Sequence, residues 1–204
     1  MFTLRKALIG LPFLLLSVAP AAWSDTTFVI IRHGEKPTAG LGQLNCRGLN
    51  RALALPPVLL SKFDTPSGLF APNPTVKKPD KGVPYFYIRP LATIEPLAIR
   101  LGLPVNIHWP MSEVVPFADE LLRQSAGTYV IAWEHHLAAR LAQVLLEKTG
   151  ASPDVVPAWR DDDFDSIYVV RHSGTANTRA VFTVERQGLN GLPDTCPAPS
   201  SNNE

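Results

Sequence analysis

The run Phe28–Ile31, FVII, is the feature that most limits how this chain can fold. Its apolar residues are continuous and do not alternate with polar ones, so the pattern predicts a strand buried on both faces. A strand of this kind needs a layer of structure on each side of its sheet. Further strand-like runs alternate with helix-like segments along the chain. We therefore predict an α/β fold, a three-layer sandwich with a largely parallel central sheet flanked by helices.

Caps, prolines and apolar runs set the other expected elements. Asn45 can cap a helix over residues 46–55, which Pro56 and Pro57 should break or kink. The proline- and glycine-rich residues 63–84 predict a long surface loop, a feature that is often functional in compact domains. The remaining expected strands cover residues 85–88, 105–108, 128–133, 167–170 and 180–185, and the remaining expected helices cover residues 91–101, 113–123 and 136–149.

The composition fits one globular domain and disfavours some partners. The chain has 204 residues, 46% of them hydrophobic and 18% charged, which is enough for a single domain with a substantial core. The formal net charge is only +1, so no overall field favours a nucleic acid or an acidic membrane surface. Any site for an anion must therefore be local.

Residues 1–24 have the layout of a secretory signal peptide. A basic start precedes the apolar run Ala7–Leu16, and small residues lead to a cleavage position after Ser24. The apolar run is shorter than the ~20 residues that a membrane span needs, which disfavours an uncleaved anchor. We therefore expect a periplasmic or secreted protein, with one mature domain over residues 25–204 and no membrane attachment after cleavage.

The chain has two cysteines, Cys46 and Cys196. In an oxidising compartment two thiols can pair, and this pair would close a long loop. Two unpaired thiols, one of them buried, are the alternative, because disulfide formation needs a short distance between Cα atoms that no sequence contains. A disulfide between Cys46 and Cys196 is the arrangement we favour.

Charged residues follow three of the expected strands at the point where each strand ends. Arg32 and His33 follow the first strand, and Arg89 follows the strand over residues 85–88. Glu134 and His135 follow a later strand. Ligands of open parallel sheets bind beyond the carboxyl ends of the strands, so these side chains should meet in one crevice. Guanidinium groups bind phosphoryl oxygens bidentately and a neutral imidazole can attack phosphorus, so the crevice suits a phosphoryl group.

The motifs around these residues resemble those of the histidine phosphatase superfamily, also called phosphoglycerate mutase-like. RHG alone is a weak tripeptide, whereas several elements in the family's order form a strong match. The resemblance covers about residues 27–170 and suggests a small exported member of branch 1. The matching segments are RHGE at 32–35, LNCRGLNRA at 44–52, RPLATIEPLA at 89–98, VIAWEHHLAARL at 130–141 and FDSIYVV at 164–170.

The resemblance implies a role for each matching position. His33 would be the nucleophile that forms a phosphohistidine intermediate. Arg32 and Arg89 would hold the phosphoryl oxygens, and His135 would bind and stabilise the transferring group. Water would then release phosphate, with no metal or other cofactor. The implied activity is that of a metal-independent phosphatase acting on a small phosphorylated substrate.

No motif fixes the general acid that would protonate the leaving group. Glu113 lies roughly where one subgroup of the family carries this residue, and we favour it. Glu134, beside His135, and Glu35, beside the nucleophile, stay open as alternatives. We assign Lys36 and Glu134 to substrate binding, with a solvated lysine as the alternative for Lys36.

Other interpretations compete with a phosphatase. A non-catalytic phosphate- or phosphoester-binding protein, a phosphohistidine protein phosphatase and a mutase are possible on the same fold, and export argues against the mutase. A zinc site formed by His33, His135 and His136 is disfavoured, because two adjacent arginines would repel a cation. The run Asp161–Asp163 lacks the spacing of a metal site and predicts a solvated loop. The substrate and the oligomeric state stay open.

Overall fold

A computed structural model describes residues 25–173 and 179–198 of the chain. The expected signal peptide, residues 1–24, lies outside the described residues, so its cleavage stays a prediction. No helix within the described ranges combines the length and the apolar character that crossing a bilayer requires.

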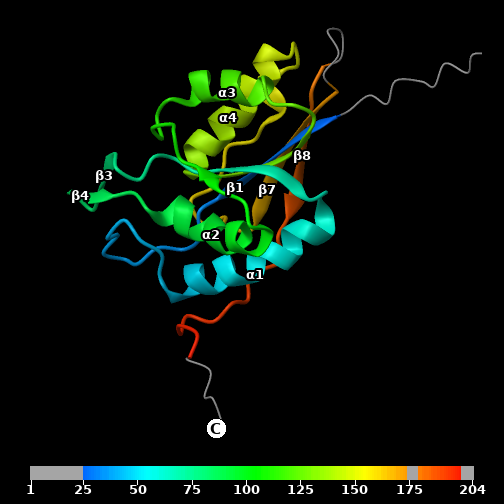
Figure 1. Cartoon of the computed structure of the whole chain (residues 1–204). Coiled ribbons are helices and arrows are strands. Elements are labelled where there is room, and N and C mark those ends of the chain that lie inside the picture. Colours follow the sequence, from blue (N-terminus) through cyan, green and yellow to red (C-terminus); the bar gives the residue numbers. More distant parts are fainter. Residues whose placement is uncertain (1–24, 174–178, 199–204) are drawn as a thin grey trace, which may run out of the picture.

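A six-stranded sheet forms the centre of the protein, with the strand order β5-β2-β6-β1-β7-β8 (Figure 1). The pairs β5–β2, β2–β6 and β6–β1 are parallel, and the pairs β1–β7 and β7–β8 are antiparallel. The predicted α/β class with a largely parallel sheet is therefore confirmed. The strands are β1 (Thr26–Arg32), β2 (Pro66–Phe70), β5 (Val105–Asn106), β6 (Gly127–Trp133), β7 (Ser166–His172) and β8 (Val181–Arg186).

Helices cover both faces of this sheet, as the sandwich prediction requires. Helices α1 (Cys46–Lys62) and α2 (Arg89–Leu101) pack together on one face, and α3 (Val114–Leu122) and α4 (His135–Lys148) pack together on the other (Figure 1). A short 3-10 helix, η1 (Pro153–Val155), follows α4. Along β1, Phe28 and Ile30 enter the core under α3 and α4, and Val29 and Ile31 enter the core under α1 and α2. Two cores explain why the FVII run is apolar without alternation.

Helix α1 is longer than its prolines predicted. Asn45 caps it as expected, because its Oδ1 accepts a hydrogen bond from the backbone N–H of Gly48 at 2.8 Å. The predicted end near residue 55 is wrong, since the helix continues through Pro56 and Pro57 to Lys62. Leu55 and Leu59 on either side of the prolines are buried in the core. Their burial outweighs the hydrogen bonds that the prolines remove.

The predicted long loop over residues 63–84 is wrong. It contains β2, a central strand of the sheet, although the β2 sequence PSGLF includes a proline and a glycine, which are rare in central strands. Gly68 has a packing reason, because a Cβ at this position would lie 3.0 Å from the Tyr129 ring on the neighbouring strand. Strands are predicted from β-branched and aromatic residues, and the β2 sequence has too few of them to be recognised as a strand.

The same segment also contains β3 (Lys77–Asp80), which pairs with β4 (Val83–Phe86) in a separate antiparallel hairpin (Figure 1). Its two-residue turn, Lys81 and Gly82, has φ values of 51° and 82°, as a tight hairpin turn requires. The expected strand over residues 85–88 is therefore wrong as a strand of the central sheet. We call β3, β4 and their turn the hairpin below.

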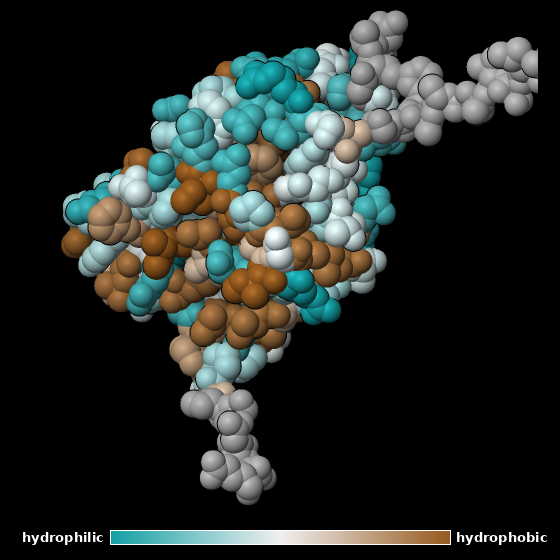
Figure 2. Space-filling view, in the orientation of Figure 1, coloured by the Kyte–Doolittle hydropathy of each residue, from teal (hydrophilic) through white to brown (hydrophobic). Residues whose placement is uncertain are grey.

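The surface over the hairpin, α1 and α2 carries many apolar side chains, whereas the surface over α3 is mostly polar (Figure 2). Exposed apolar residues on these elements include Leu53 on α1, Ile99 on α2 and Phe86 on the hairpin. The two helical layers therefore differ in the surface that they present to solvent.

The C-terminal segment of the described chain lies against α1. Cys46 and Cys196 form a disulfide. Arg47 pairs with Asp194 at 2.7 Å, and Asn50 donates hydrogen bonds to two backbone carbonyls of the same segment. These contacts hold the last described residues on the helix that follows the RHGE motif.

Candidate active site

The carboxyl ends of β1 and β6 lie side by side at one edge of the sheet. Arg32 is in register with Trp133, and the backbone N–H of His33 donates to the Trp133 carbonyl at 3.1 Å. The residues that follow the two strands, His33 on one and Glu134 and His135 on the other, therefore leave the sheet at the same point. The structure brings these strand ends together as the sequence predicted.

Arg89 reaches the site from a different kind of element. We expected Arg89 to follow a strand of the central sheet. It is instead the first residue of α2 and comes soon after the hairpin. Pro90 stands in the first turn, where its fixed φ suits a helix start. The Thr93 hydroxyl, one turn later, donates to the Arg89 carbonyl at 2.8 Å and accepts from the Gly34 N–H at 2.9 Å. This hydroxyl links the start of α2 to the loop that carries His33.

Two aromatic rings hold the cationic groups around His33. The His33 ring lies edge-on to Tyr87, with centroids 5.8 Å apart, and 6.4 Å from Phe164. The Arg89 guanidinium lies 4.8 Å from the centre of the Tyr87 ring, and the Arg32 guanidinium lies 3.8 Å from the centre of the Phe164 ring. Each guanidinium thus stacks on one of the rings that flank the histidine.

The geometry of His33 leaves one ring nitrogen free to react. Its Nδ1 lies 2.7 Å from the Gly34 carbonyl, which can only accept, so Nδ1 carries the proton and Nε2 keeps its lone pair. Burial, aided by the positive charges of Arg89 and Arg32, lowers the pKa of His33 to about 3. The imidazole is therefore neutral at neutral pH, the form that a nucleophile requires.

Arg32 is anchored by one nitrogen and leaves the other two available. Its Nη1 donates to the backbone carbonyls of Arg160, Asp161 and Asp163 at 3.3, 2.7 and 3.1 Å. Its buried Nε has no partner, and Nη2 makes no hydrogen bond with any described residue. The Nε–Nη2 edge is the edge that binds an oxyanion bidentately.

Arg89 repeats this arrangement on the other side of His33. Its Nη1 donates to Asp80 Oδ2 at 2.6 Å, and Gly40 O lies 3.5 Å away. Its buried Nε has no partner within the described chain, and Nη2 makes no hydrogen bond there. Asp80 also accepts from Lys36 Nζ at 3.0 Å. A carboxylate on the hairpin therefore holds two cations of the site, and Arg89 keeps one edge for a ligand.

Glu134 and His135 stand at the N-terminus of α4. Glu134 caps the helix, because its Oε2 accepts from the Leu137 N–H at 3.0 Å. Its Oε1 lies 2.8 Å from His135 Nδ1, without the direction of a hydrogen bond, and 3.8 Å from Lys78 Nζ. Burial disfavours the charged carboxylate, but His135, the Leu137 N–H and Lys78 outweigh burial and lower the pKa of Glu134 to about 2. Glu134 is thus ionised at neutral pH and is poorly suited to donate a proton, while its role in substrate binding stays a prediction.

The predicted solvated loop over Asp161–Asp163 is wrong in part. Asp161 is exposed, yet its Oδ1 lies 2.6 Å from His135 Nε2, and the loop supplies the carbonyls that hold Arg32. Asp163 fixes the loop, because its carboxylate accepts from the Ser166 hydroxyl at 2.6 Å and from two backbone N–H groups. The acidic run is therefore part of the wall of the site.

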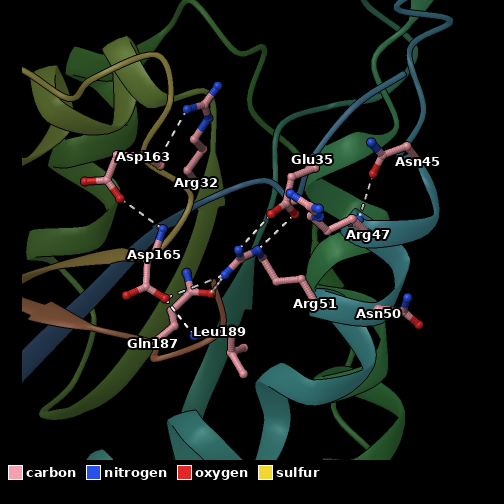
Figure 3. A network of polar contacts seen from close by, with 12 residues as sticks. Arg32, Glu35, Asn45, Arg47, Asn50, Arg51, Asp163, Asp165, Gln187 and Leu189 are labelled. Carbon is pink, nitrogen blue, oxygen red and sulfur yellow. Dashed lines mark hydrogen bonds and ion pairs between the residues drawn. The ribbon is translucent and has the colours of Figure 1, made fainter. Parts of the chain in front are cut away.

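A buried ion-pair network joins the loop that carries His33 to helix α1 (Figure 3). Arg51, fully buried on α1, donates from Nε and Nη2 to the two Glu35 carboxylate oxygens at 3.0 and 2.7 Å, and from Nη1 to Gln187 at 2.8 Å. The loop and α1 approach closely, since a Cβ on Gly34 would lie 2.9 Å from the Gly48 carbonyl oxygen. Glu35 is thus engaged in holding the loop, which disfavours it as the general acid.

Two other predicted residues, Glu113 and Lys36, are exposed at the surface of the protein. Glu113 is the exposed N-cap residue of α3 and makes no side-chain hydrogen bond or ion pair with the described residues of the site. Lys36 keeps a side chain that is 39% exposed while it pairs with Asp80. The acid role of Glu113 and the substrate-binding role of Lys36 stay predictions.

Sequence reasoning missed Lys78, Asp80, Tyr87 and Phe164. The Tyr87 hydroxyl is buried without a hydrogen-bond partner in the described chain, and burial raises the pKa of Tyr87. Its position two residues before Arg89 was an available signal. Lys78 and Asp80 stand in the proline-rich segment, where no motif distinguishes them from other charged residues.

Comparisons with known proteins place this geometry in a known fold. No protein-family model and no curated protein matches the chain. Solved structures do match, and at these low identities they show the fold alone: the chain shares the predicted α/β fold with proteins described as a histidine phosphatase, a phosphoglycerate mutase and a phosphoserine phosphatase. The protein histidine phosphatase SixA complexed with tungstate has a TM-score of 0.53 at 14% identity, over 79% of this chain and 97% of that one.

Two further structures give similar values. Phosphoglycerate mutase from Plasmodium falciparum has a TM-score of 0.52 at 8% identity, over 87% of this chain and 96% of that one. A phosphoserine phosphatase variant from Entamoeba histolytica in complex with phosphoserine has a TM-score of 0.51 at 14% identity, over 81% and 98%.

Proposed function

We propose that this protein is a metal-independent phosphatase that hydrolyses a phosphomonoester through a phosphohistidine intermediate on His33. One observation carries the proposal. The ring of a neutral, buried histidine with an unprotonated Nε2 lies beside the two aromatic rings on which Arg32 and Arg89 stack, and each arginine keeps its Nε–Nη2 edge free of partners among the described residues. Two such edges and a nucleophilic nitrogen match the charge and the shape of a phosphoryl group.

The residues suggest a two-step reaction. In the first step the Nε2 lone pair of His33 attacks phosphorus, and the bond from phosphorus to the leaving oxygen breaks. Arg32 and Arg89 hold the oxygens that gain charge, and the Gly34 carbonyl keeps accepting a hydrogen bond from the Nδ1–H of the resulting cationic ring. In the second step water attacks phosphorus, the P–N bond breaks, and inorganic phosphate leaves with His33 neutral again.

His135 would stabilise the transferring group from the β6 side. Its Nε2 now contacts Asp161, an exposed side chain that a phosphate oxygen can replace. The leaving oxygen needs a proton, and Glu113 is the general acid that we propose. Glu113→Gln should slow an alkyl phosphate more than p-nitrophenyl phosphate, because p-nitrophenolate leaves without protonation. An equal effect on both substrates would remove Glu113 from this role.

We also propose that the protein is exported, as a mature domain over residues 25–204. The signal-like residues 1–24 and the disulfide between Cys46 and Cys196 support this, since disulfides persist in oxidising compartments. N-terminal sequencing of the mature protein from a periplasmic or secreted fraction should begin at Asp25. Recovery of the intact N-terminus in the cytosolic fraction would contradict export.

A small phosphorylated molecule is the substrate class that we propose. A phosphohistidine protein is the second candidate, because the matched SixA structure is described as a protein histidine phosphatase. A panel of p-nitrophenyl phosphate, phosphoserine, phosphoglycerate and a phosphohistidine peptide ranks the two classes. Preference for the peptide would favour the second candidate.

Hydrolysis of p-nitrophenyl phosphate in the presence of a chelator tests the function itself. We expect wild-type turnover to resist the chelator and His33→Ala to lose turnover. A wild-type protein that binds phosphate but turns over no substrate of the panel would instead be a non-catalytic phosphate-binding protein.

A further inference from the structure

Two adjacent histidines and an aspartate converge beside the candidate active site. Asp161 Oδ1 lies 2.6 Å from His135 Nε2 and 3.5 Å from His136 Nε2. The two imidazole rings lie with centroids 3.9 Å apart. Glu134 also offers a carboxylate oxygen, and the ligand atoms of Glu134, His135 and His136 lie within 4.8 Å of one another.

One of these separations is close to that of a zinc site. Zinc binds imidazole nitrogens and carboxylate oxygens at about 2.0–2.2 Å in a tetrahedral arrangement, so its donor atoms stand about 3.3 Å apart. The 3.5 Å between Asp161 Oδ1 and His136 Nε2 is near this value, whereas the 2.6 Å between Asp161 Oδ1 and His135 Nε2 is a hydrogen bond that must lengthen when both atoms bind the cation. Imidazole with carboxylate suits Zn²⁺, Co²⁺, Ni²⁺ or Cu²⁺ better than Mg²⁺ or Ca²⁺.

Glu134 lies on the side of the His135 ring opposite Asp161. Its Oε1 lies 2.8 Å from His135 Nδ1, the nitrogen that faces away from Asp161. This contact lacks the direction of a hydrogen bond, so Glu134 contributes a negative charge beside the ring, and the opposite nitrogen, Nε2, is the one that can bind the cation. Solvent can deliver the cation, because the side chains of His136 and Asp161 are 67% and 85% exposed.

This set differs from the trio of His33, His135 and His136, which the nearby arginines disfavour. It replaces the buried His33 with a carboxylate on the solvent side, so two negative charges, from Glu134 and Asp161, face the two imidazoles. Arg32 also lies near this set, since its Nη1 donates to the Asp161 carbonyl at 2.7 Å. The Asp161 carboxylate supplies charge compensation against this arginine that the trio lacks.

We infer that His135, His136 and Asp161 bind a divalent transition cation such as Zn²⁺, with the charge of Glu134 beside His135, and that the bound cation inhibits the phosphatase. Binding follows from the geometry alone. Inhibition rests on the proposed function, because a His135 Nε2 atom that ligates the cation can no longer donate to the transferring phosphoryl group.

Direct binding is measured first, on the mature disulfide-bonded protein, by calorimetry with Zn²⁺ and by visible absorption with Co²⁺. Wild type should bind one Zn²⁺ per chain and give the intense absorption of low-coordinate Co²⁺. His136→Ala and Asp161→Asn should each weaken binding at least tenfold. Asp162→Asn, on the same loop but paired with Arg160, and His172→Ala, a histidine elsewhere, are matched controls and should bind as wild type. Wild-type affinity in His136→Ala, or no binding by wild type, would overturn the inference.

Inhibition is measured second, on p-nitrophenyl phosphate hydrolysis. Without metal, His136→Ala should keep wild-type turnover, because His136 is no part of the catalytic machinery. Added Zn²⁺ should inhibit wild type reversibly, and His136→Ala should need at least tenfold more Zn²⁺. Equal Zn²⁺ sensitivity of the two proteins would overturn the inhibitory role.

The same binding assay on His33→Ala separates the two proposals. Binding equal to that of wild type would support a site that is independent of the nucleophile. If the wild-type protein hydrolyses no phosphoester but its metal binding still depends on His136, the proposed function fails and the metal site stands. If the wild-type protein hydrolyses a phosphoester but binds no metal, the metal site fails and the proposed function stands.

Discussion

The two sides of the candidate active site are built in different ways. On one side, Arg32, His33 and His135 stand at the ends of β1 and β6, buried seven-residue strands in parallel register. On the other side, Lys78, Asp80 and Tyr87 lie on or just after a separate two-stranded hairpin whose residues are mostly exposed. The first side fixes the reacting groups, and the second supplies charges and a hydroxyl around them.

This difference has a consequence for the roles of the two sides. A buried parallel register allows little movement, so the strand-end side suits the attacking nitrogen and the oxygen clamp, which need fixed geometry. The hairpin contacts Arg89 through Asp80, and Tyr87, the residue after the hairpin, lies against the same guanidinium. This side therefore acts on the site by positioning Arg89. We therefore expect large losses from changes on the strand-end side and smaller, more selective changes on the hairpin side.

Among the residues around the nucleophile, the largest effect should come from Arg32→Ala. This change removes the free Nε–Nη2 edge on the strand-end side, and loss of a preorganised donor costs about 10²–10³-fold in turnover. We expect kcat/KM for p-nitrophenyl phosphate to fall about 10³-fold, with Arg32→Lys only partly restoring it because lysine lacks the bidentate edge. Steady-state kinetics on both variants measure this. A loss of less than tenfold would contradict the clamp.

A pH effect on stability tests the burial of His33. The pKa of His33 is about 3 in the folded protein and ordinarily 6.5, so between these values the unfolded chain binds a proton that the folded chain does not. Stability therefore falls as the pH decreases through this window. The expected loss from this group between pH 7 and pH 5 is about 2 kcal/mol.

Urea unfolding of wild type and His33→Ala at both pH values measures that loss. The other titrating groups are common to both proteins, so the variant should lose about 2 kcal/mol less than wild type. Equal losses in the two proteins would show that His33 binds its proton in the folded state as well.

On the hairpin side, Asp80→Asn should change affinity more than chemistry. The substitution removes a negative charge near the pocket but keeps an oxygen that can accept from Arg89. Inorganic phosphate, as a competitive inhibitor, should bind about tenfold more tightly, since one tenfold step corresponds to about 1.4 kcal/mol of electrostatic free energy. Asp162→Asn, whose carboxylate pairs with the exposed Arg160, should leave the inhibition constant unchanged. Weaker phosphate binding in Asp80→Asn would instead make Asp80 chiefly a support for Arg89.

The smallest effect should come from Tyr87→Phe. If the buried, unpartnered hydroxyl donates to the bound substrate, its loss should lower kcat/KM several-fold, up to about tenfold. The free energy of unfolding should stay the same or rise, because a buried hydroxyl without a partner costs stability. A less stable protein with unchanged kinetics would show that the hydroxyl has a structural role.

The same two sides differ in how far a sequence predicts them. The strand-end side follows from local rules, because a continuous apolar run fixes a buried strand and the next residues must then stand at the sheet edge. The fold class and the grouping of Arg32, His33 and His135 therefore came from the residues themselves. Arg89 was expected in the site, although after a central strand and not at the start of α2.

The parts that the sequence failed to predict depend on tertiary contacts that leave little trace in the sequence. Strand β2 has a glycine where it packs against Tyr129, and together with the proline at its start this makes its composition look like a loop. The prolines of α1 are outweighed by burial of the leucines around them. Asp161 looked like a solvated acid because its partner, His135, is 26 residues away in the chain. Each of these misses has the same cause, a long-range contact that overrides a local preference.

The central claim is that His33 becomes phosphorylated, and trapping the intermediate tests it most directly. The mature protein is mixed with radiolabelled p-nitrophenyl phosphate and quenched in alkaline detergent within milliseconds, because the P–N bond is labile in acid. We predict label on the peptide that contains His33, stable to base and lost in acid, and none in His33→Ala. Unimpaired turnover by His33→Ala, or label on a different residue of the wild-type protein, would contradict the account.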